Sequence, residues 1–484
     1  NKPLVLVIED LHWIDKTSEK LLDHLIGSLP NTRILLILLY RPEYTHPWEN
    51  HSFYGRIGLD QLSAHTSMAL VQAILQGGEV APDLREVVLT RSGGNPLFVE
   101  ELTQSLLENG TIERRDDQYV LTGKASDIRV PDTIQGIIAA RIDRVDEGVK
   151  RIMQVASVIG REFAFRILQT IMGMREGMKE DLRSSLLNLQ GLEFISQKQL
   201  FPELEYLFKH ALTQEVAYNS LLLKRRKDIH EKIGTAIETL YPENLEEYYE
   251  LLAYHYVRSD NPDKALAYLD LANQKAARFN AMEEALAYFE EAMKLLDSLP
   301  ETQANQERRI SLVVNQIMVF KLHFKVVEYY ALLNRYEPMA MGLGNQGLLG
   351  AYYNRKADCE WWFGKLDEGI QTITKAIELC RASGNIEDLG YAYHGLAWFY
   401  VHQGNFDPVF AFKKEAIPVL ERAFNLRWYV WTFCVAGFAY INLGRWDEAL
   451  EEDQKALSVA EKYADNSLIS FANFSISWLY ISKG

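Results

Sequence analysis

Three glycines at a regular spacing constrain the fold of the C-terminal half of this chain. Gly364, Gly404 and Gly444 lie 40 residues apart, and the residues at fixed offsets from them are also repeated. Small residues precede each glycine by seven positions, and an aspartate and an alanine follow it: Ala357, Ala397 and Gly437; Asp367, Asp407 and Asp447; Ala376, Ala416 and Ala456. This pattern predicts stacked helix pairs, in which glycine opens the turn, aspartate caps the second helix and small residues allow close packing.

The repeats are tetratricopeptide-like, although their period exceeds the usual length of about 34 residues. Alanines at 265, 272, 285 and 292 extend the expected helical array back to about residue 245, whereas residues 309–347 fit the pattern poorly. Pro418 falls inside an expected helix and should bend or end it. A fourth repeat would place its small residue at Ser477 and its glycine at Gly484, so we expect a truncated solenoid over residues 241–484.

The N-terminal segment predicts a different architecture. An apolar run from Leu4 to Ile8 ends in Glu9 and Asp10, a helix is expected from Lys16 to Leu29, and a second apolar run ends shortly before Arg41. Uninterrupted apolar runs are typical of parallel strands buried on both faces, and a β-α-β unit brings the ends of both strands to one sheet edge. Acids at that edge can hold Mg²⁺ beside a nucleotide, as in a Walker B element, and Arg41 can contact the γ-phosphate.

The expected partner of this element is absent from the sequence. A phosphate-binding loop has the pattern G-x-x-x-x-G-K-[ST], but Gly-Lys occurs only at residues 123–124 and 364–365, where Ala125 and Leu366 follow. We therefore expect the chain to be a fragment that starts inside a nucleotide-binding domain, with residues 1–61 as its distal part.

Three motifs in order resemble the STAND class of AAA-related signalling ATPases: VIEDLHWID, LLYRPE and GNPLFVEEL. The resemblance implies Glu9 and Asp10 as catalytic and Mg²⁺-binding residues, Arg41 as a nucleotide-binding residue, and a helical lid over residues 62–129. In that class a Gly-x-Pro turn touches the nucleotide base, which here falls on Gly94 and Pro96. Asn95-Pro96 is also a good helix N-terminus that requires no ligand. Glu9 departs from the more frequent Asp of the class, which puts tight Mg²⁺ binding and hydrolysis in doubt.

Residues 130–240 are expected to form a winged-helix region. Apolar residues at helical spacing between Ile134 and Val158 indicate a core-facing helix pair, and a helix, strand, turn and strand follow up to His210. STAND relatives use such a module as an internal clamp, in which a histidine contacts the ADP β-phosphate. The match assigns this role to His210, although a lone histidine is more often an ordinary surface or core residue. The basic run Lys224–Lys227 is more simply a solvated helix face than a DNA contact.

Nearly the whole chain also resembles the regulatory half of bacterial class III adenylate/guanylate cyclases. The resemblance rests on PDTIQ, AARID, VIGREF and the segment from Phe208 to Arg226. It implies an upstream cyclase domain as the output. An ATP-dependent transcription activator with a DNA-binding domain beyond the chain, and a kinase-linked sensor, are alternatives that residues 1–484 do not separate.

Composition limits the partners and the compartment. Lys and Arg number 51 against 66 Asp and Glu, a net charge of −15, which argues against broad nucleic-acid binding. Three cysteines without metal-ligand spacing, no long apolar run and no visible signal peptide favour a cytoplasmic protein. We expect α/β structure followed by mostly α structure, ATP or ADP with Mg²⁺ as ligands, a protein partner on the repeats and nucleotide-dependent self-association. Most of the tryptophans should fill seams between helices, and a few could line a partner-binding groove.

Overall fold

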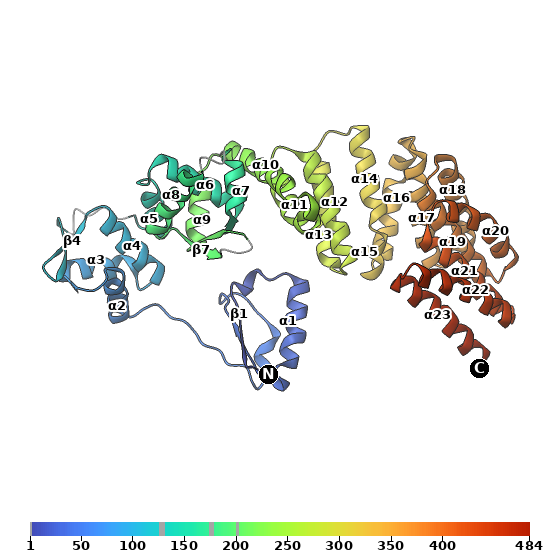
Figure 1. Ribbon diagram of the computed structural model, residues 1–484, viewed down its shortest axis with the longest axis horizontal. Helices are drawn as coiled ribbons and strands as arrows, with labels where there is room; N and C mark the ends of the chain where they lie inside the picture. The colour runs from blue at the N-terminus through green and yellow to red at the C-terminus, as the bar shows by residue number, and fades with distance from the viewer. Residues whose placement is uncertain (1, 125–130, 174–178, 200–202) are drawn as a thin grey trace. The chain divides into compact units, whose positions relative to one another are not determined.

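The computed structural model describes residues 2–124, 131–173, 179–199 and 203–484. These residues form two compact units, Asn1–Leu269 and Asp270–Gly484, and each is described separately. The chain is mostly helical, with three small sheets in the first unit (Figure 1). The expected boundary at residues 129–130 lies outside the described residues. None of the described helices is both long and apolar enough to cross a membrane.

The chain begins with the expected β-α-β unit. Its elements are β1 (Leu4–Ile8), α1 (Lys16–Ser28) and β2 (Ile34–Leu38), and the two strands pair in parallel with Ile8 opposite Leu38. Asp15 caps α1 by accepting a hydrogen bond from the Ser18 amide at 2.8 Å. The sequence therefore predicts this unit correctly in element type, order and pairing.

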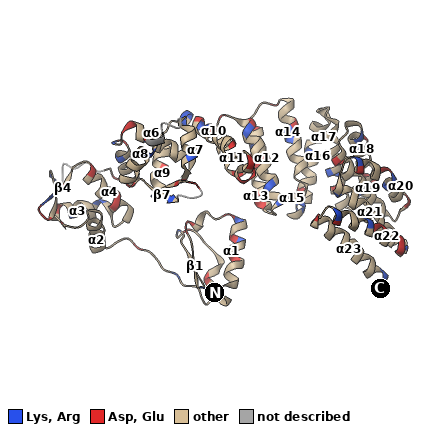
Figure 2. Cartoon of the chain, in the orientation of Figure 1, with Lys and Arg blue, Asp and Glu red and all other residues tan. Residues whose placement is uncertain are grey.

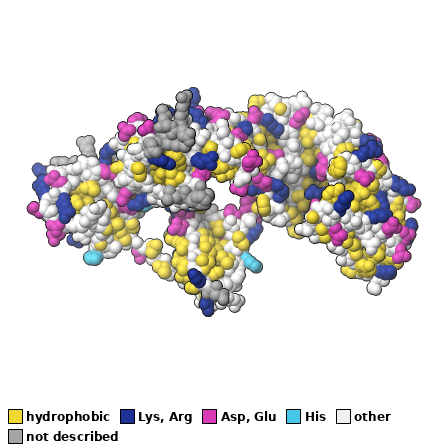
Figure 3. All heavy atoms as spheres, in the orientation of Figure 1, with side chains coloured by type: hydrophobic (Ala, Val, Ile, Leu, Met, Phe, Trp, Pro, Cys, Tyr) yellow, Lys and Arg dark blue, Asp and Glu magenta, His cyan; other side chains and the backbone are white. Residues whose placement is uncertain are grey.

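The prediction that these strands are buried on both faces is wrong. Ile8, Leu36 and Leu38 pack against the core formed with α1, but side chains on the other face alternate outward, and Val5 and Leu35 are both 59% exposed. Apolar atoms accordingly cover much of this part of the surface (Figure 3). No second layer within the described residues covers the face, because the chain continues from β2 into irregular structure.

The rest of the first unit contains helices and two three-stranded sheets. In the first sheet β5 lies between β3 and β4, and in the second β8 lies between β6 and β7. The elements are α2 (Ala64–Ile74), β3 (Glu79–Val80), α3 (Pro82–Ser92), α4 (Pro96–Glu108), β4 (Ile112–Arg115), β5 (Gln118–Leu121), α5 (Ile134–Ile142), α6 (Glu147–Ile159), β6 (Glu162–Ala164), α7 (Phe165–Ile171), α8 (Lys179–Gly191), β7 (Ile195–Gln199), β8 (Glu205–Phe208), α9 (Ala211–Asn219), α10 (Leu223–Leu240) and α11 (Tyr249–Val257). The helix pair expected between residues 134 and 158 is confirmed as α5 and α6.

The second unit is an array of helices. After α12 (Pro262–Arg278), which spans the division between the units, come α13 (Met282–Asp297), α14 (Gln303–Asn315), α15 (Ile317–Leu322), α16 (Val326–Gly342), α17 (Gln346–Trp362), α18 (Leu366–Ser383), α19 (Ile386–Gln403), α20 (Asp407–Arg422), α21 (Leu426–Asn442), α22 (Trp446–Lys462) and α23 (Asn466–Lys483). Residues 309–347, which fit the repeat poorly, are thus largely helical as well. Pro418 lies inside α20 and does not end it.

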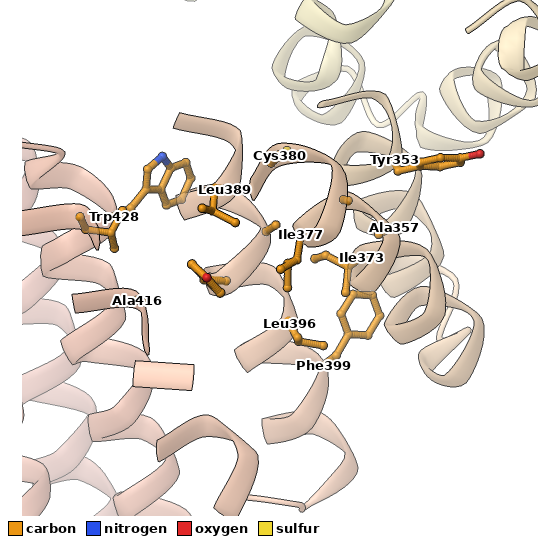
Figure 4. Packing of buried hydrophobic residues seen from close by; sticks show 14 residues of the cluster. Tyr353, Ala357, Ile373, Ile377, Cys380, Leu389, Leu396, Phe399, Ala416 and Trp428 are labelled. Atoms are coloured by element: carbon orange, nitrogen blue, oxygen red, sulfur yellow. The ribbon is translucent and has the colours of Figure 1, made fainter. Parts of the chain in front are cut away.

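The 40-residue period is confirmed as helix pairs. Gly364, Gly404 and Gly444 have φ angles of +68° to +71° and lie in the turns within the pairs α17/α18, α19/α20 and α21/α22. The repeated alanines at 357, 376, 416 and 456 are buried. Ala357, Ala376 and Ala416 belong to one cluster with large side chains such as Ile373, Leu396 and Phe399 (Figure 4). Small residues therefore mark the seams, as the sequence predicts.

The predicted aspartate caps are wrong. Asp367, Asp407 and Asp447 lie in the first turns of their helices, and those helix starts have no side-chain cap hydrogen bond. The observed caps belong to a second 40-residue series at the start of the other helix of each pair: Asn345, Asn385, Asn425 and Asp465. Each accepts a hydrogen bond from a backbone amide two or three residues further on, which satisfies an otherwise unpaired N–H group.

Candidate functional site

The predicted acidic edge forms where the two parallel strands end. The Leu39 amide donates to the Ile8 carbonyl at 2.9 Å and the Leu11 amide donates to the Leu39 carbonyl at 2.9 Å, so the segments carrying Glu9, Asp10 and Arg41 leave the same edge. All three side chains are exposed. This placement follows from the β-α-β topology and agrees with the expectation from sequence.

Asp10 adopts a left-handed backbone conformation just after β1. Its φ angle is +53°, in the left-handed region, and it precedes a short 3₁₀ turn, Leu11–Trp13. Its Oδ2 lies 3.5 Å from Nη1 of Arg161, the residue before β6. Among the described residues, no group of three or more His, Cys, Asp or Glu side chains is placed to hold a metal ion. Mg²⁺ binding by Glu9 and Asp10 therefore remains a prediction.

The Gly-x-Pro turn has a sufficient local explanation. Gly94 has φ +80°, and a Cβ atom there would lie 2.5 Å from the Leu62 carbonyl oxygen, while the Leu62 amide donates to the Gly94 carbonyl at 2.8 Å. Asn95 caps α4 by accepting from the Phe98 amide at 3.1 Å, and Pro96 is the first helical residue. The structure thus accounts for all three residues as a turn and helix start, and contact with a nucleotide base stays a prediction.

His210 lies at the N-terminus of α9, directly after β8, and faces α4. Its Nε2 is 3.4 Å from Oε2 of Glu100, which lies one helical turn after Pro96, but the geometry does not make a hydrogen bond, and this buried nitrogen has no other partner. Lys209 approaches the same carboxylate, with Nζ 2.5 Å from Oε1 of Glu100, and is also 3.0 Å from Oε2 of Glu193. Two basic side chains therefore converge on one carboxylate.

This environment favours the ionised form of Glu100. The closeness of the His210 side chain, together with the Lys209 ammonium, lowers the pKa of Glu100 against the opposing effect of burial. Glu100, Lys209 and His210 are all only partly exposed, with 21%, 37% and 27% of their side chains accessible. A negative charge at this position is thus well stabilised.

A buried ion-pair cluster joins α4 to the elements that follow. Arg141 of α5 is 2% exposed, and its Nη1 lies 2.6 Å from Oε2 of buried Glu101. Its Nε donates to both carboxylate oxygens of Glu108 at 3.0 and 3.1 Å, and its Nη2 donates to the Leu192 carbonyl at 2.9 Å. Burial alone would lower the pKa of Arg141, but the two carboxylates raise it. Sequence reasoning missed this cluster because its partners lie 33 to 51 residues away without any periodic signal.

The structure brings only some of the predicted site residues near one another. Glu9, Asp10 and Arg41 share a sheet edge, and His210 lies near the helix that begins at Pro96. Within the described ranges, no hydrogen bond or ion pair joins any two of the six predicted residues. Glu100 and Lys209 were not predicted as site residues, although both lie inside segments that the sequence singled out: GNPLFVEEL and the segment from Phe208 to Arg226.

The repeats offer aromatic side chains as a second candidate surface. Trp398 Nε1 donates to His394 Nε2 at 3.0 Å, Trp431 stacks on Phe471 with ring centroids 4.6 Å apart, and Trp428 is buried. These residues fill seams between helices, as expected for most of the tryptophans. Trp362 and Trp478 are nearly half exposed. Charges of both signs are interspersed along the helices in the view of Figure 2.

Comparison with known proteins gives limited likenesses. No family model matches the chain. An uncharacterised protein of Rhizobium meliloti (strain 1021) is 25% identical over 312 residues, which cover 64% of this chain but only 29% of that protein. This chain therefore aligns with less than a third of its relative's length.

Two solved structures resemble the chain weakly. A Signal Transduction ATPase with Numerous Domains (STAND) protein with a tetratricopeptide repeat sensor, from Pyrococcus horikoshii, has a TM-score of 0.40 and 14% identity, with 99% of this chain and 71% of that chain covered. Aspartyl phosphate phosphatase F from Bacillus subtilis has a TM-score of 0.38 and 10% identity, with 89% and 96% covered.

Proposed function

We propose that this chain is the nucleotide-binding and partner-sensing portion of a larger signalling protein. In this proposal residues 1–61 belong to a P-loop NTPase domain, residues 62–129 form its lid, and residues 130–240, which contain the β6–β8–β7 sheet, act as a winged helix. The repeats over residues 241–484 bind a protein partner. The output domain lies outside the chain and is a nucleotide cyclase, with a transcription activator or a kinase-linked sensor as alternatives.

The observation that carries the proposal is the position of His210. Its buried Nε2 makes no hydrogen bond and lies 3.4 Å from Oε2 of Glu100, in a turn that also presents Lys209 toward α4. A buried polar atom without a hydrogen bond is costly, and a phosphate oxygen in place of the Glu100 carboxylate would supply one. The residues present therefore fit the β-phosphate of ADP at this position, with Gly94 and Pro96 near the base.

The acidic edge fits a second part of the same ligand. Glu9 and Asp10 supply exposed carboxylates suited to Mg²⁺, and Arg41 at the same edge supplies a guanidinium for the γ-phosphate. When bound, Mg²⁺ would neutralise charge on the phosphates. The open apolar face of β1 and β2 supports the assignment to a larger sheet, because exposed apolar strands of this kind are normally covered by further elements.

Switching would follow from differential binding. ADP favours a closed state through His210, whereas the γ-phosphate of ATP favours an open state, since a ligand shifts a two-state equilibrium only by its difference in affinity between the states. Loss of one charge-assisted contact at His210 should cost the closed state about 1.5–3 kcal/mol.

The His210→Ala variant of the longer protein tests this proposal. We expect weaker ADP binding and higher basal output, measured as cyclase activity or transcription. His65→Ala is the matched control, because His65 is an exposed histidine on α2. If ADP affinity and basal output of His210→Ala both match those of the unmodified protein, the phosphate assignment is wrong.

This chain by itself should not hydrolyse ATP. Its sequence lacks the pattern G-x-x-x-x-G-K-[ST], whose backbone amides and lysine supply most phosphate contacts. Purified chain mixed with Mg-ATP should release phosphate at background rates. Robust hydrolysis that Glu9→Gln abolishes would contradict this architecture.

The repeats support a protein-binding role through their partly exposed aromatic side chains. Tryptophan is enriched among residues that dominate binding energy at protein interfaces. Trp362 and Trp478 are 48% and 45% exposed, whereas Trp428 is buried. Trp362→Ala or Trp478→Ala should lower the affinity for a protein partner that the repeats bind, without loss of helix content.

Sedimentation of the chain with ADP or ATP would test nucleotide-dependent self-association.

A further inference from the structure

The contact between α4 and the turn after β8 has the composition of an anion site that is already filled by a side chain. Lys209 and His210 both face Glu100, at 2.5 Å and 3.4 Å, and among the residues that the structure describes no other carboxylate approaches both of them. Glu193 approaches only Lys209. A lysine ammonium and an imidazole are the donors that commonly bind a phosphate group, and a carboxylate presents the same charge-bearing oxygens.

We propose that Glu100 is a built-in competitor that occupies the phosphate position of Lys209 and His210 until a phosphorylated ligand displaces it. This inference rests on the proposed function, because it concerns the same basic turn, and it adds Lys209 as a second phosphate-binding residue. Binding of a phosphate then requires the carboxylate to leave. The ligand class is a di- or triphosphate, whose charge exceeds that of one carboxylate.

The surroundings of Glu100 allow a phosphate to replace its carboxylate without unfolding the contact between α4 and α5. Buried Arg141 of α5 pairs with buried Glu101 and with partly exposed Glu108, so α4 stays attached to α5 when Glu100 loses its partners. Glu100 itself is at the margin of this cluster and its side chain is 21% exposed. Displacement would therefore move one side chain into solvent and leave the helix in place.

The consequence is a threshold for ligand binding. A competitor that must be displaced lowers the apparent affinity for the ligand. The reason is that only the fraction of protein in which Glu100 has left the site is competent to bind. Removing its charge should raise the affinity for phosphates, because Lys209 and His210 then lose the one carboxylate that contacts both of them. Removing the carboxylate of Glu193 should have a smaller effect, since His210 does not contact it.

The test uses the 484-residue chain and pyrophosphate as the probe, with binding measured by calorimetry and by the imidazole NMR signals of histidine-labelled protein. We expect Glu100→Gln to bind pyrophosphate about tenfold more tightly than the unmodified chain. Glu193→Gln is the matched control and should change affinity less. The double variant Glu100→Gln, Lys209→Ala should lose the gain. Circular dichroism checks that each variant folds.

Two results would overturn the inference. Equal pyrophosphate affinity in Glu100→Gln and unmodified chain would show that Glu100 does not compete, and a gain that survives in the double variant would place the anion elsewhere. These outcomes are distinct from failure of the proposed function. The proposed function fails if His210→Ala leaves the ADP affinity of the longer protein unchanged, even where pyrophosphate competes with Glu100 in this chain.

Discussion

Two contacts hold helices together by opposite means: the joint, which is the ion-pair cluster of Arg141, Glu101 and Glu108 between α4 and α5, and the seams between helices of the repeats. At the joint, the buried guanidinium of Arg141 forms ion pairs with two carboxylates and donates a hydrogen bond to a carbonyl, and these partners come from segments far apart in sequence. In the repeats, alanines at 40-residue intervals let neighbouring helices approach, and apolar side chains fill the rest. The first arrangement depends on every partner being present, whereas the second depends on volume.

Removing the central guanidinium of Arg141 should have the largest effect on stability. Arg141→Ala leaves buried Glu101 and partly exposed Glu108 without their partner, which should destabilise α4 and α5 by about 3–5 kcal/mol. Hydrogen exchange of the amides in both helices measures the effect. Arg114→Ala, which removes an exposed arginine paired with Asp117, should change little. Similar exchange in both variants would show that the joint is not held by charge.

Acid should weaken the first unit through a pair of buried histidines. Nδ1 of His230 and Nδ1 of His255 lie 2.9 Å apart, with Tyr218, Tyr254, Arg226 and Arg258 around them. Burial, with the nearby arginines, lowers the pKa of His230 to about 4, and burial, with His230 and Arg258, lowers that of His255 to about 3.

The sign of the effect follows from where the protons bind. Between pH 6.5 and about 4 the unfolded chain takes up protons that the folded pair does not, so stability present at neutral pH is lost as the pH falls. We expect a loss on the order of 2–3 kcal/mol from His230. Urea unfolding at pH 7 and pH 4.5 measures it. An equal loss in unmodified chain and in His230→Gln would contradict the assignment.

Overpacking tests the seams of the second unit. Ala416 and Ala456 are buried, so Ala416→Trp or Ala456→Trp should destabilise the local helix pair by about 1–3 kcal/mol. Ala423→Trp adds the same side chain at an exposed position and should be nearly neutral. Thermal melting compares the three variants. Unchanged melting of both buried variants would remove the support for the 40-residue alignment.

The smallest effect concerns one backbone conformation. Phe424 is 86% exposed and has φ +52°, where the equivalent position one repeat earlier is Gly384 with φ +73°. Phe424→Gly should stabilise by roughly 0.5–1 kcal/mol, since glycine avoids the left-handed penalty at some entropic cost. Gly384→Ala should lose a similar amount. Denaturant midpoints of the two variants should therefore shift in opposite directions.

The sequence predicts those features whose residues form a contiguous or repeating pattern. The parallel pairing of β1 with β2 follows from two short apolar runs separated by a helix, and the buried alanines follow from the 40-residue period. The caps at Asn345, Asn385, Asn425 and Asp465 also repeat every 40 residues, so they could have been predicted from the same period. The cluster at Arg141 and the contact of Glu100 with Lys209 could not be predicted, because pairing between distant charged residues leaves no periodic trace.

The matching helix boundaries make the repeat a natural unit of gain or loss during evolution. Gly384 is followed by Asn385, and Phe424 by Asn425, and both asparagines cap the next helix. Deleting residues 385–424 would join Gly384 to Asn425 and recreate the same junction, with the next helix pair in register. Because each pair packs mainly on its neighbours, relatives that differ by whole multiples of 40 residues could keep the same local geometry.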